Sequence, residues 1–246
     1  MKKRERHKKR MHPLLKLGIL VAIAGAAVLF SMSNFFTIEE YVVEGNSYYS
    51  DEEILAMGNC EKGPNIFWDK KISDIKERLS NDTYMESVDI DIKLPGTVVI
   101  NLVERKQIAA VVYGEEYVVI DSNGTALRKT SVQPKITVVK GLTLSKLNMG
   151  EAIEAEEKVR LKQTLELLNT AEKNNMFFKK IRVSKSQINA YVFDSLVCKG
   201  KSADMMEAIE KGELQNVIQT LMDKDIERGT INVSGDGYIT FSPEID

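Results

Sequence analysis

The start of the chain divides sharply by charge. Residues 1–16 form a head with eight basic side chains and one acid, Glu5, which gives a net charge of +7. The next twenty residues, 17–36, read LGILVAIAGAAVLFSMSNFF and contain no charged side chain. A helix of about 20 apolar residues spans a hydrocarbon core of roughly 30 Å, and basic residues stay on the cytoplasmic side. We therefore predict a transmembrane helix at 17–36, a cytoplasmic head at 1–16 and export of the remaining residues.

A cleaved signal peptide is the alternative, because it also begins with a basic region. Its apolar region is shorter, and the best cleavage sequence here, Ala24-Gly25-Ala26, lies inside the run with Val28 and Leu29 still to come. The pattern favours an uncleaved anchor. Small residues recur at every fourth position, at Gly18, Ala22 and Ala26, a spacing that lets membrane helices approach one another closely.

Composition restricts the chemistry of the exported part. The whole chain carries a net charge of −2, so the residues after Lys16 total −9, which argues against binding nucleic acid. Both histidines lie in the head, so the exported part cannot form a Ser-His-Asp triad or a histidine-ligated zinc site. Its two cysteines, Cys60 and Cys198, are far apart in sequence, which favours separate buried thiols over a disulfide. We predict no catalytic residue, cofactor, metal or small-molecule substrate.

The exported part divides into two predicted domains, residues 37–106 and 107–246. In the first, a strand at 38–44 ends at the turn pair Gly45-Asn46. Ser50 and Glu53 have the spacing of a helix capping box, and a second helix, 69–80, has a stripe of isoleucine and leucine. Strands are expected at 84–92 and 97–103. The order is strand, helix, helix, strand, strand.

The second predicted domain mixes strands with two long helices. We expect strands at 108–113, 117–121, 136–139, 178–183, 187–193, 195–199, 230–234 and 238–241, and helices at 155–174 and 203–224. The first helix should turn Val159, Leu161, Leu165, Leu168 and Ala171 inward. The fold class is α+β, with a mainly antiparallel sheet covered by helices.

The ordered set of these segments resembles the bacterial division proteins FtsQ and DivIB. The matching stretches are VVEGNSYYSDEEI, GPNIFWDKKISDIKERL, VDIDIKLPGTVVINLVERKQIA, YVVIDSNGTAL and PKITVVKGL. The resemblance implies a POTRA domain at 37–106, followed by the β domain of that family. It also implies FtsL-type and FtsB/DivIC-type membrane proteins as partners, a place at the division septum and a role in controlling septal peptidoglycan synthesis.

Four short motifs invite a chemical interpretation. Ser73 and Lys76 have the S-x-x-K spacing of penicillin-binding enzymes, but no Lys-Thr-Gly follows. Asp89 and Asp91 lie on one face of a strand, where a solvated surface is the better interpretation. Residues 195–202 are close to a phosphate-binding loop, but Ser195 stands where its first glycine should be, which favours a plain strand-to-helix turn. Glu104 and Arg105 are interpreted as an ion pair at the domain junction.

The remaining hypothesis is a binding scaffold, with the membrane lipid and division proteins as its partners. The strand at 230–234 is predicted to pack one face inward and to keep an open backbone edge for strand addition by a partner peptide. The predicted anchors are Ile231, Val233, Tyr238, Ile239 and Phe241. The alternative is a C-terminal hairpin that only completes the core. On an open edge, Asn232→Pro should leave the fold intact and abolish partner binding. An exported ligand-binding sensor is the alternative, although the cytoplasmic head is short for signalling. A cell-wall enzyme is a further one and lacks identifiable catalytic residues.

Overall fold

The computed structural model describes residues 13–68, 71–235 and 238–244. The chain forms two compact units, Met1–Asn81 with Met85–Glu104, and Asp82–Tyr84 with Arg105–Asp246. The predicted basic head lies outside the described residues as far as His12, as do Asp69 and the turn residues Asp236 and Gly237.

Helix α1 (Pro13–Ser31) is the one helix among the described residues that is long and apolar enough to cross a membrane. None of its residues is buried. It begins and ends earlier than predicted. Proline is favoured in the first turn of a helix, and the sequence after Ser31 continues as a short 3-10 helix, η1 (Asn34–Phe36), instead of extending α1.

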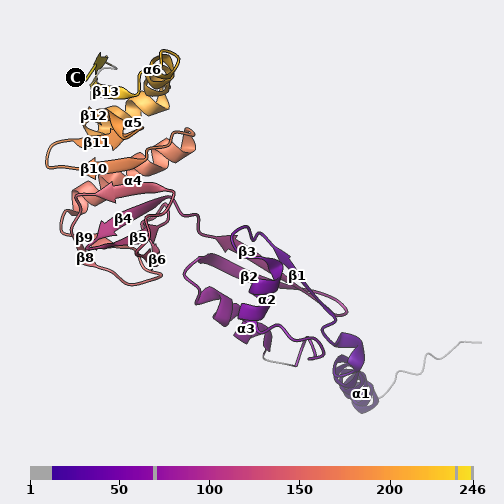
Figure 1. The fold of residues 1–246 in the computed structure, drawn as a ribbon. Helices are drawn as coiled ribbons and strands as arrows, with labels where there is room; N and C mark the ends of the chain where they lie inside the picture. Colours follow the sequence, from indigo (N-terminus) through magenta and orange to yellow (C-terminus); the bar gives the residue numbers. More distant parts are fainter. Residues whose placement is uncertain (1–12, 69–70, 236–237, 245–246) are drawn as a thin grey trace, which may run out of the picture. The chain divides into compact units, whose positions relative to one another are not determined.

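The first unit has the predicted order of elements (Figure 1). They are β1 (Glu40–Glu44), α2 (Asp51–Gly58), α3 (Lys71–Ser80), β2 (Met85–Lys93) and β3 (Thr97–Glu104). The sheet order is β1-β3-β2, with β1 parallel and β2 antiparallel to β3. Its core is built mainly from aliphatic side chains of both helices and of β2 and β3, among them Ile54, Ile75, Leu79, Val88, Val98, Ile100 and Leu102. Side chains of β1 are only partly buried against this core.

Two local sequence signals fix the turn into α2. The Ser50 side chain accepts a hydrogen bond from the backbone of Glu53, whose carboxylate accepts one from the backbone of Ser50, so the predicted capping box is confirmed. Gly45 has a φ of +92°, and a Cβ there would lie 2.1 Å from the carbonyl oxygen of Leu102. Only glycine fits this turn.

A nine-stranded mixed sheet forms the second unit. Its strands are β4 (Ala109–Tyr113), β5 (Glu116–Ile120), β6 (Ala126–Thr130), β7 (Thr137–Lys140), β10 (Lys180–Val183), β11 (Ile188–Tyr191), β12 (Ser195–Gly200), β13 (Arg228–Ser234) and β14 (Tyr238–Ser242). The order is β14-β13-β12-β11-β10-β7-β4-β5-β6, and most neighbouring pairs are antiparallel. A separate two-stranded ribbon joins β8 (Leu144–Lys146) to β9 (Glu154–Ala155).

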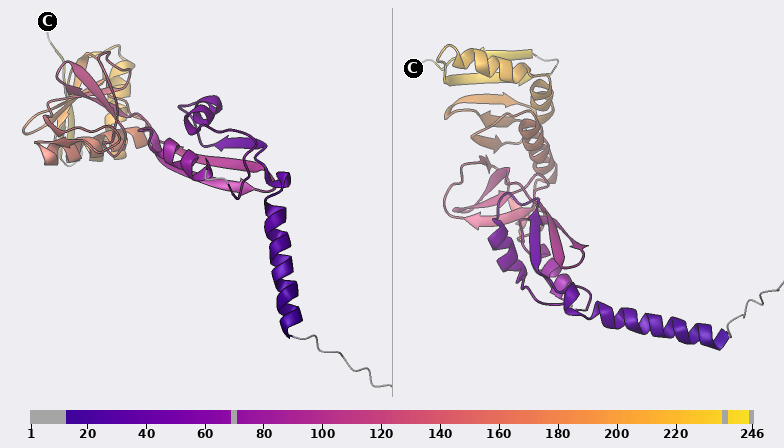
Figure 2. Two further views of the ribbon diagram at one scale, coloured as in Figure 1. Left: turned by 90° about the horizontal axis from the view of Figure 1, so that it is seen from below. Right: turned by 90° about the vertical axis from the view of Figure 1, so that its right-hand side faces the viewer.

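Helices α4 (Lys158–Lys173), α5 (Ser202–Glu210) and α6 (Glu213–Met222) cover one face of this sheet (Figure 2). The fold class, α+β, is confirmed. The single helix predicted at 203–224 is wrong, because Gly212 adopts a left-handed conformation (φ +72°) that separates α5 from α6. Val159 is also misplaced by the prediction. It lies at the start of α4 and is 70% exposed.

Candidate partner-binding edge

The C-terminal strands end the large sheet, but β13 is not its edge. β13 pairs in parallel with β12 and antiparallel with β14, so Asn232 lies opposite both Lys199 and Thr240. The prediction of an open edge at β13 is therefore wrong, and so is the expectation that Asn232→Pro would be tolerated. The crossover through α5 and α6 places β13 beside β12, a pairing that alternation within one strand does not reveal. The outermost strand is β14.

The five predicted anchors divide between core and surface. Ile231 and Val233 are 0% and 4% exposed and face the helices, so they hold β13 on the core. Ile239 and Phe241 are half-buried on β14 and pack against the same core. Tyr238 is 69% exposed. The structure thus brings Tyr238, Ile239 and Phe241 together on the edge strand and removes the other two from the surface.

One residue of this site escaped the sequence analysis. Gly229 on β13 has a φ of +132°, and a Cβ there would lie 2.6 Å from the Phe241 ring and 2.7 Å from the carbonyl oxygen of Ser242. The ring therefore lies directly over the glycine and fastens β14 to its neighbour. A glycine inside a strand often marks such a close approach, and this was the signal available in the sequence.

The sheet face opposite the helices is mostly polar near this edge. Tyr191, Val197, Thr230 and Ser242 follow one another across four neighbouring strands. They line part of a shallow hollow of about 350 Å³, and the Lys180 ammonium lies 4.0 Å from the centre of the Tyr191 ring. A strand added to β14 would therefore meet a polar face on one side and the rim of the apolar core on the other.

Two of the short motifs contact each other in the first unit. The Lys76 ammonium lies 2.9 Å from the Asp89 carboxylate, with 50% and 75% of the two side chains exposed. Asp91 accepts a hydrogen bond from the Asn101 amide. Both aspartates lie on the solvated face of β2, as predicted. In the second unit, β12 ends at Gly200 and α5 begins at Ser202, which confirms a strand-to-helix turn there.

Glu104 and Arg105 were predicted to pair with each other, and this is wrong. The Glu104 carboxylate accepts hydrogen bonds from the backbone of Ser47, Tyr48 and Tyr49, at 2.7, 2.6 and 3.2 Å. It thereby fixes the turn between β1 and α2 in the first unit. Arg105 instead binds Asp121 in the second unit. Successive side chains of an extended chain point in opposite directions, so adjacent residues of this kind find different partners.

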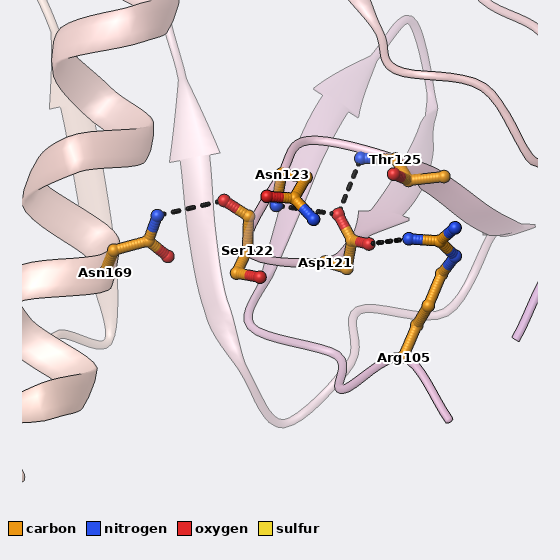
Figure 3. Close-up of polar contacts among 6 residues, drawn as sticks. All are labelled: Arg105, Asp121, Ser122, Asn123, Thr125 and Asn169. Carbon is orange, nitrogen blue, oxygen red and sulfur yellow. Dashed lines mark hydrogen bonds and ion pairs between the residues drawn. The ribbon is translucent and has the colours of Figure 1, made fainter. Parts of the chain in front are cut away.

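Asp121 is the centre of a buried polar cluster (Figure 3). Its side chain is 3% exposed and lies 2.8 Å from a guanidinium nitrogen of Arg105, whose own side chain is 19% exposed. The other carboxylate oxygen accepts hydrogen bonds from the backbone of Asn123 and Thr125. Asn169 on α4 donates to the carbonyl oxygen of Ser122. The cluster fastens the turn between β5 and β6 to the start of the second unit, a structural role.

Both cysteines are free thiols, one in each unit. Burial raises the pKa of the Cys198 thiol to about 12 and that of the Cys60 thiol to about 11. Cys198 is fully buried within β12, and Cys60 is half-buried. Thiols in this state are poor nucleophiles at neutral pH.

Known proteins match the chain over both units. The family of FtsQ-type POTRA domains matches residues 36–105. The cell division protein DivIB of Clostridium acetobutylicum is 27% identical over 216 residues, 85% of this chain and 83% of that protein. The cell division protein FtsQ of Rickettsia bellii is 29% identical over 99 residues, 40% of this chain and 36% of that protein.

A solved structure, the major extracytoplasmic domain of DivIB from Geobacillus stearothermophilus, covers 50% of this chain and 97% of its own, with 13% identity and a TM-score of 0.32. Residues 36–105 thus match the FtsQ-type POTRA family, and the chain as a whole is similar to the cell division proteins DivIB and FtsQ.

Proposed function

We propose that the protein is a membrane-anchored, non-enzymatic scaffold of the division machinery. In this role it binds FtsL-type and FtsB/DivIC-type partners and helps to control septal peptidoglycan synthesis. The family supports a role in division. The scaffold role rests on one observation, the position of β14 at the end of the large sheet.

Strand addition at β14 follows from the hydrogen-bond pattern of antiparallel strands. Alternate residues of β14 bond to β13, and the residues between them direct N–H and C=O groups outward. An extended partner segment can bond to these groups, with main-chain bonds giving affinity and side-chain contacts giving specificity. Tyr238 is the exposed aromatic anchor beside them, and such residues often cost more than about 1 kcal/mol of binding energy when truncated.

Two neighbouring proline substitutions test this edge. Of Ile239→Pro and Thr240→Pro, one removes a donor to β13 and the other removes an outward donor, because neighbouring residues face opposite edges. The outward variant should keep the melting temperature of the full chain in detergent and lose capture of an FtsB/DivIC-type protein. The matched control is a second pair of neighbouring substitutions, Arg128→Pro and Lys129→Pro, on β6 at the opposite edge of the sheet. One of the two removes an outward donor there, and that variant should fold and still capture the partner.

Unchanged affinity in the outward β14 variant would refute strand addition there. Tyr238→Ser is a second, milder test. The Tyr238 side chain is 69% exposed, so this substitution should weaken capture without lowering the melting temperature.

The proposed topology places the N-terminus in the cytoplasm and both folded units outside. It is supported by the +7 charge of the head and by the length and apolar character of α1. Protease added to intact spheroplasts should digest both units. Their protection would refute this orientation.

A fluorescent fusion to the protein should collect at the septum, and uniform membrane fluorescence would argue against the septal location.

A further inference from the structure

The end of α1 is bonded to a loop that lies far along the chain in the first unit. The Asn65 amide donates hydrogen bonds to the carbonyl oxygens of Ser31 and Ser33, at 3.0 and 3.3 Å. The Trp68 indole nitrogen donates to the hydroxyl of Ser31 at 3.0 Å. The last carbonyls of a helix lack partners within the helix, and this loop supplies one. Residues 65–68 therefore lie at the level where α1 ends.

Large aromatic side chains surround this point and remain exposed. Phe35, Phe67 and Trp68 are 60%, 49% and 55% exposed. Phe36 links them: its ring centre lies 5.1 Å from that of Phe35 and 5.2 Å from that of Phe67. We call Phe35, Phe67 and Trp68 the aromatic foot. Three exposed rings on one spot form an apolar surface of the kind that marks an interaction site.

The length of α1 sets the depth of the aromatic foot. Its 19 residues span about 28 Å at 1.5 Å per residue, close to the thickness of a hydrocarbon core. Lys16 lies in the first turn, from which a long basic side chain reaches the headgroups. When α1 crosses a bilayer, Ser31 reaches the boundary between acyl chains and headgroups, and the bonds from Asn65 and Trp68 hold the aromatic foot there. Tryptophan and other aromatic residues are enriched at this depth, because their rings are apolar and the indole N–H is polar.

We propose that the aromatic foot inserts into the lipid surface of the leaflet in which α1 ends and fixes the first unit to the membrane. The occupant is phospholipid, because α1 is continuous with the patch and brings it to the bilayer. This inference rests on the part of the proposed function that has α1 cross the membrane. Lipid contact by residues 65–68 goes beyond an anchor helix, which alone would leave the first unit free of the bilayer.

Trp68 is the only tryptophan of the chain, so its fluorescence reports directly on the aromatic foot. The full chain is reconstituted into phosphatidylcholine–phosphatidylglycerol vesicles whose lipids carry bromine either near the top of the acyl chains or near the bilayer centre. Bromine near the top should reduce Trp68 emission by at least about twofold and central bromine should do less, while aqueous iodide has little effect.

The matched control moves the tryptophan to the far end of the same sheet, in Trp68→Phe with Val103→Trp. Val103 is 50% exposed and lies six residues along β3 from Thr97, which is about 20 Å. Thr97 is paired with Glu40 at the start of β1. The control tryptophan should respond to iodide and not to bromine.

Two results would overturn the proposal. Trp68 could be quenched by iodide as fully as the control and be insensitive to bromine, which would place the aromatic foot in water. It could also be shielded from both quenchers, which would mean that protein, not lipid, covers it. Failure of the wider proposal is distinguishable, because the spheroplast protease assay reports the orientation of α1 without reference to the aromatic foot.

Discussion

Substitution of Asp121 by asparagine should strongly destabilise the second unit and leave the first unit unchanged. The asparagine oxygen can still accept from the backbone of Asn123 and Thr125, so the main loss is the charge opposite Arg105. Removing one partner of a buried ion pair costs about 3–5 kcal/mol. Because the Arg105 side chain keeps 19% of its exposure and can recruit water, we expect the lower end, about 3 kcal/mol. That is a large share of an ordinary domain's stability.

The assay uses a separate probe for each unit. Cys198 is buried in the second unit, so its reaction with a thiol reagent in urea reports the unfolding of that unit in a Cys60→Ser background. Trp68 emission reports the first unit. With a urea slope of about 2 kcal/mol per molar, a loss of about 3 kcal/mol lowers the Cys198 midpoint by about 1.5 M. The Trp68 midpoint should not move.

An exposed ion pair supplies the matched control. Lys76→Met removes one partner of the pair with Asp89, and such surface pairs contribute at most about 1 kcal/mol. Arg105→Met completes a double-mutant cycle with Asp121→Asn. The Cys198 midpoint shift for Asp121→Asn should exceed the Trp68 midpoint shift for Lys76→Met. A smaller or equal shift, or a coupling energy near zero between Asp121→Asn and Arg105→Met, would refute the argument that the buried pair holds this turn.

Three further perturbations follow from burial. Ile75→Asp places a carboxylate where the native side chain is 1% exposed, at a cost of several kcal/mol. It should abolish the Trp68 transition in urea and spare that of Cys198, whereas a retained Trp68 transition would contradict the assigned core. Gly229→Ala should destabilise β14 by about 1–3 kcal/mol through the clash with Phe241. In melting curves, adding Phe241→Ala should recover part of the stability that Gly229→Ala removes. If the stability losses of the two substitutions simply add, the clash is ruled out. The Cys198 pKa is raised in the folded state from 9.0 to about 12, so stability of the second unit should fall as pH rises above about 9. In urea titrations followed by circular dichroism, Cys198→Ala should reduce this fall, and an identical fall in the variant would exclude the thiol.

Local signals predicted the elements of the first unit well. The capping box at Ser50 and the glycine at Gly45 each act within a few residues, and the order of strands and helices follows from them. The aliphatic stripe of α3 also lies where periodicity placed it, with Ile75 and Leu79 buried. Such interactions can be read from sequence because both partners lie in the same short segment.

The candidate site was predictable only in part. Tyr238, Ile239 and Phe241 were assigned to the last strand, and they lie on it. Which strand forms the edge depends on the parallel pairing of β12 with β13, made across two helices. The ion pair of Arg105 with Asp121 likewise joins residues that a strand pair and a turn bring together. Long-range pairings of this kind leave no mark on either segment alone.

The hydrogen bonds from Asn65 and Trp68 to Ser31 join the end of α1 directly to a loop of the first unit. They restrict rotation of that unit relative to the anchor helix. Because they fix the first unit in rotation about the axis of α1, turning the helix turns that unit with it. Gly18, Ala22 and Ala26 lie on one side of α1, where a neighbouring membrane helix can approach closely. A helix packed on that side would set the rotational orientation of the first unit about the axis of α1. Helix contacts inside the bilayer would thereby determine which surface of the first unit faces a given neighbour outside it.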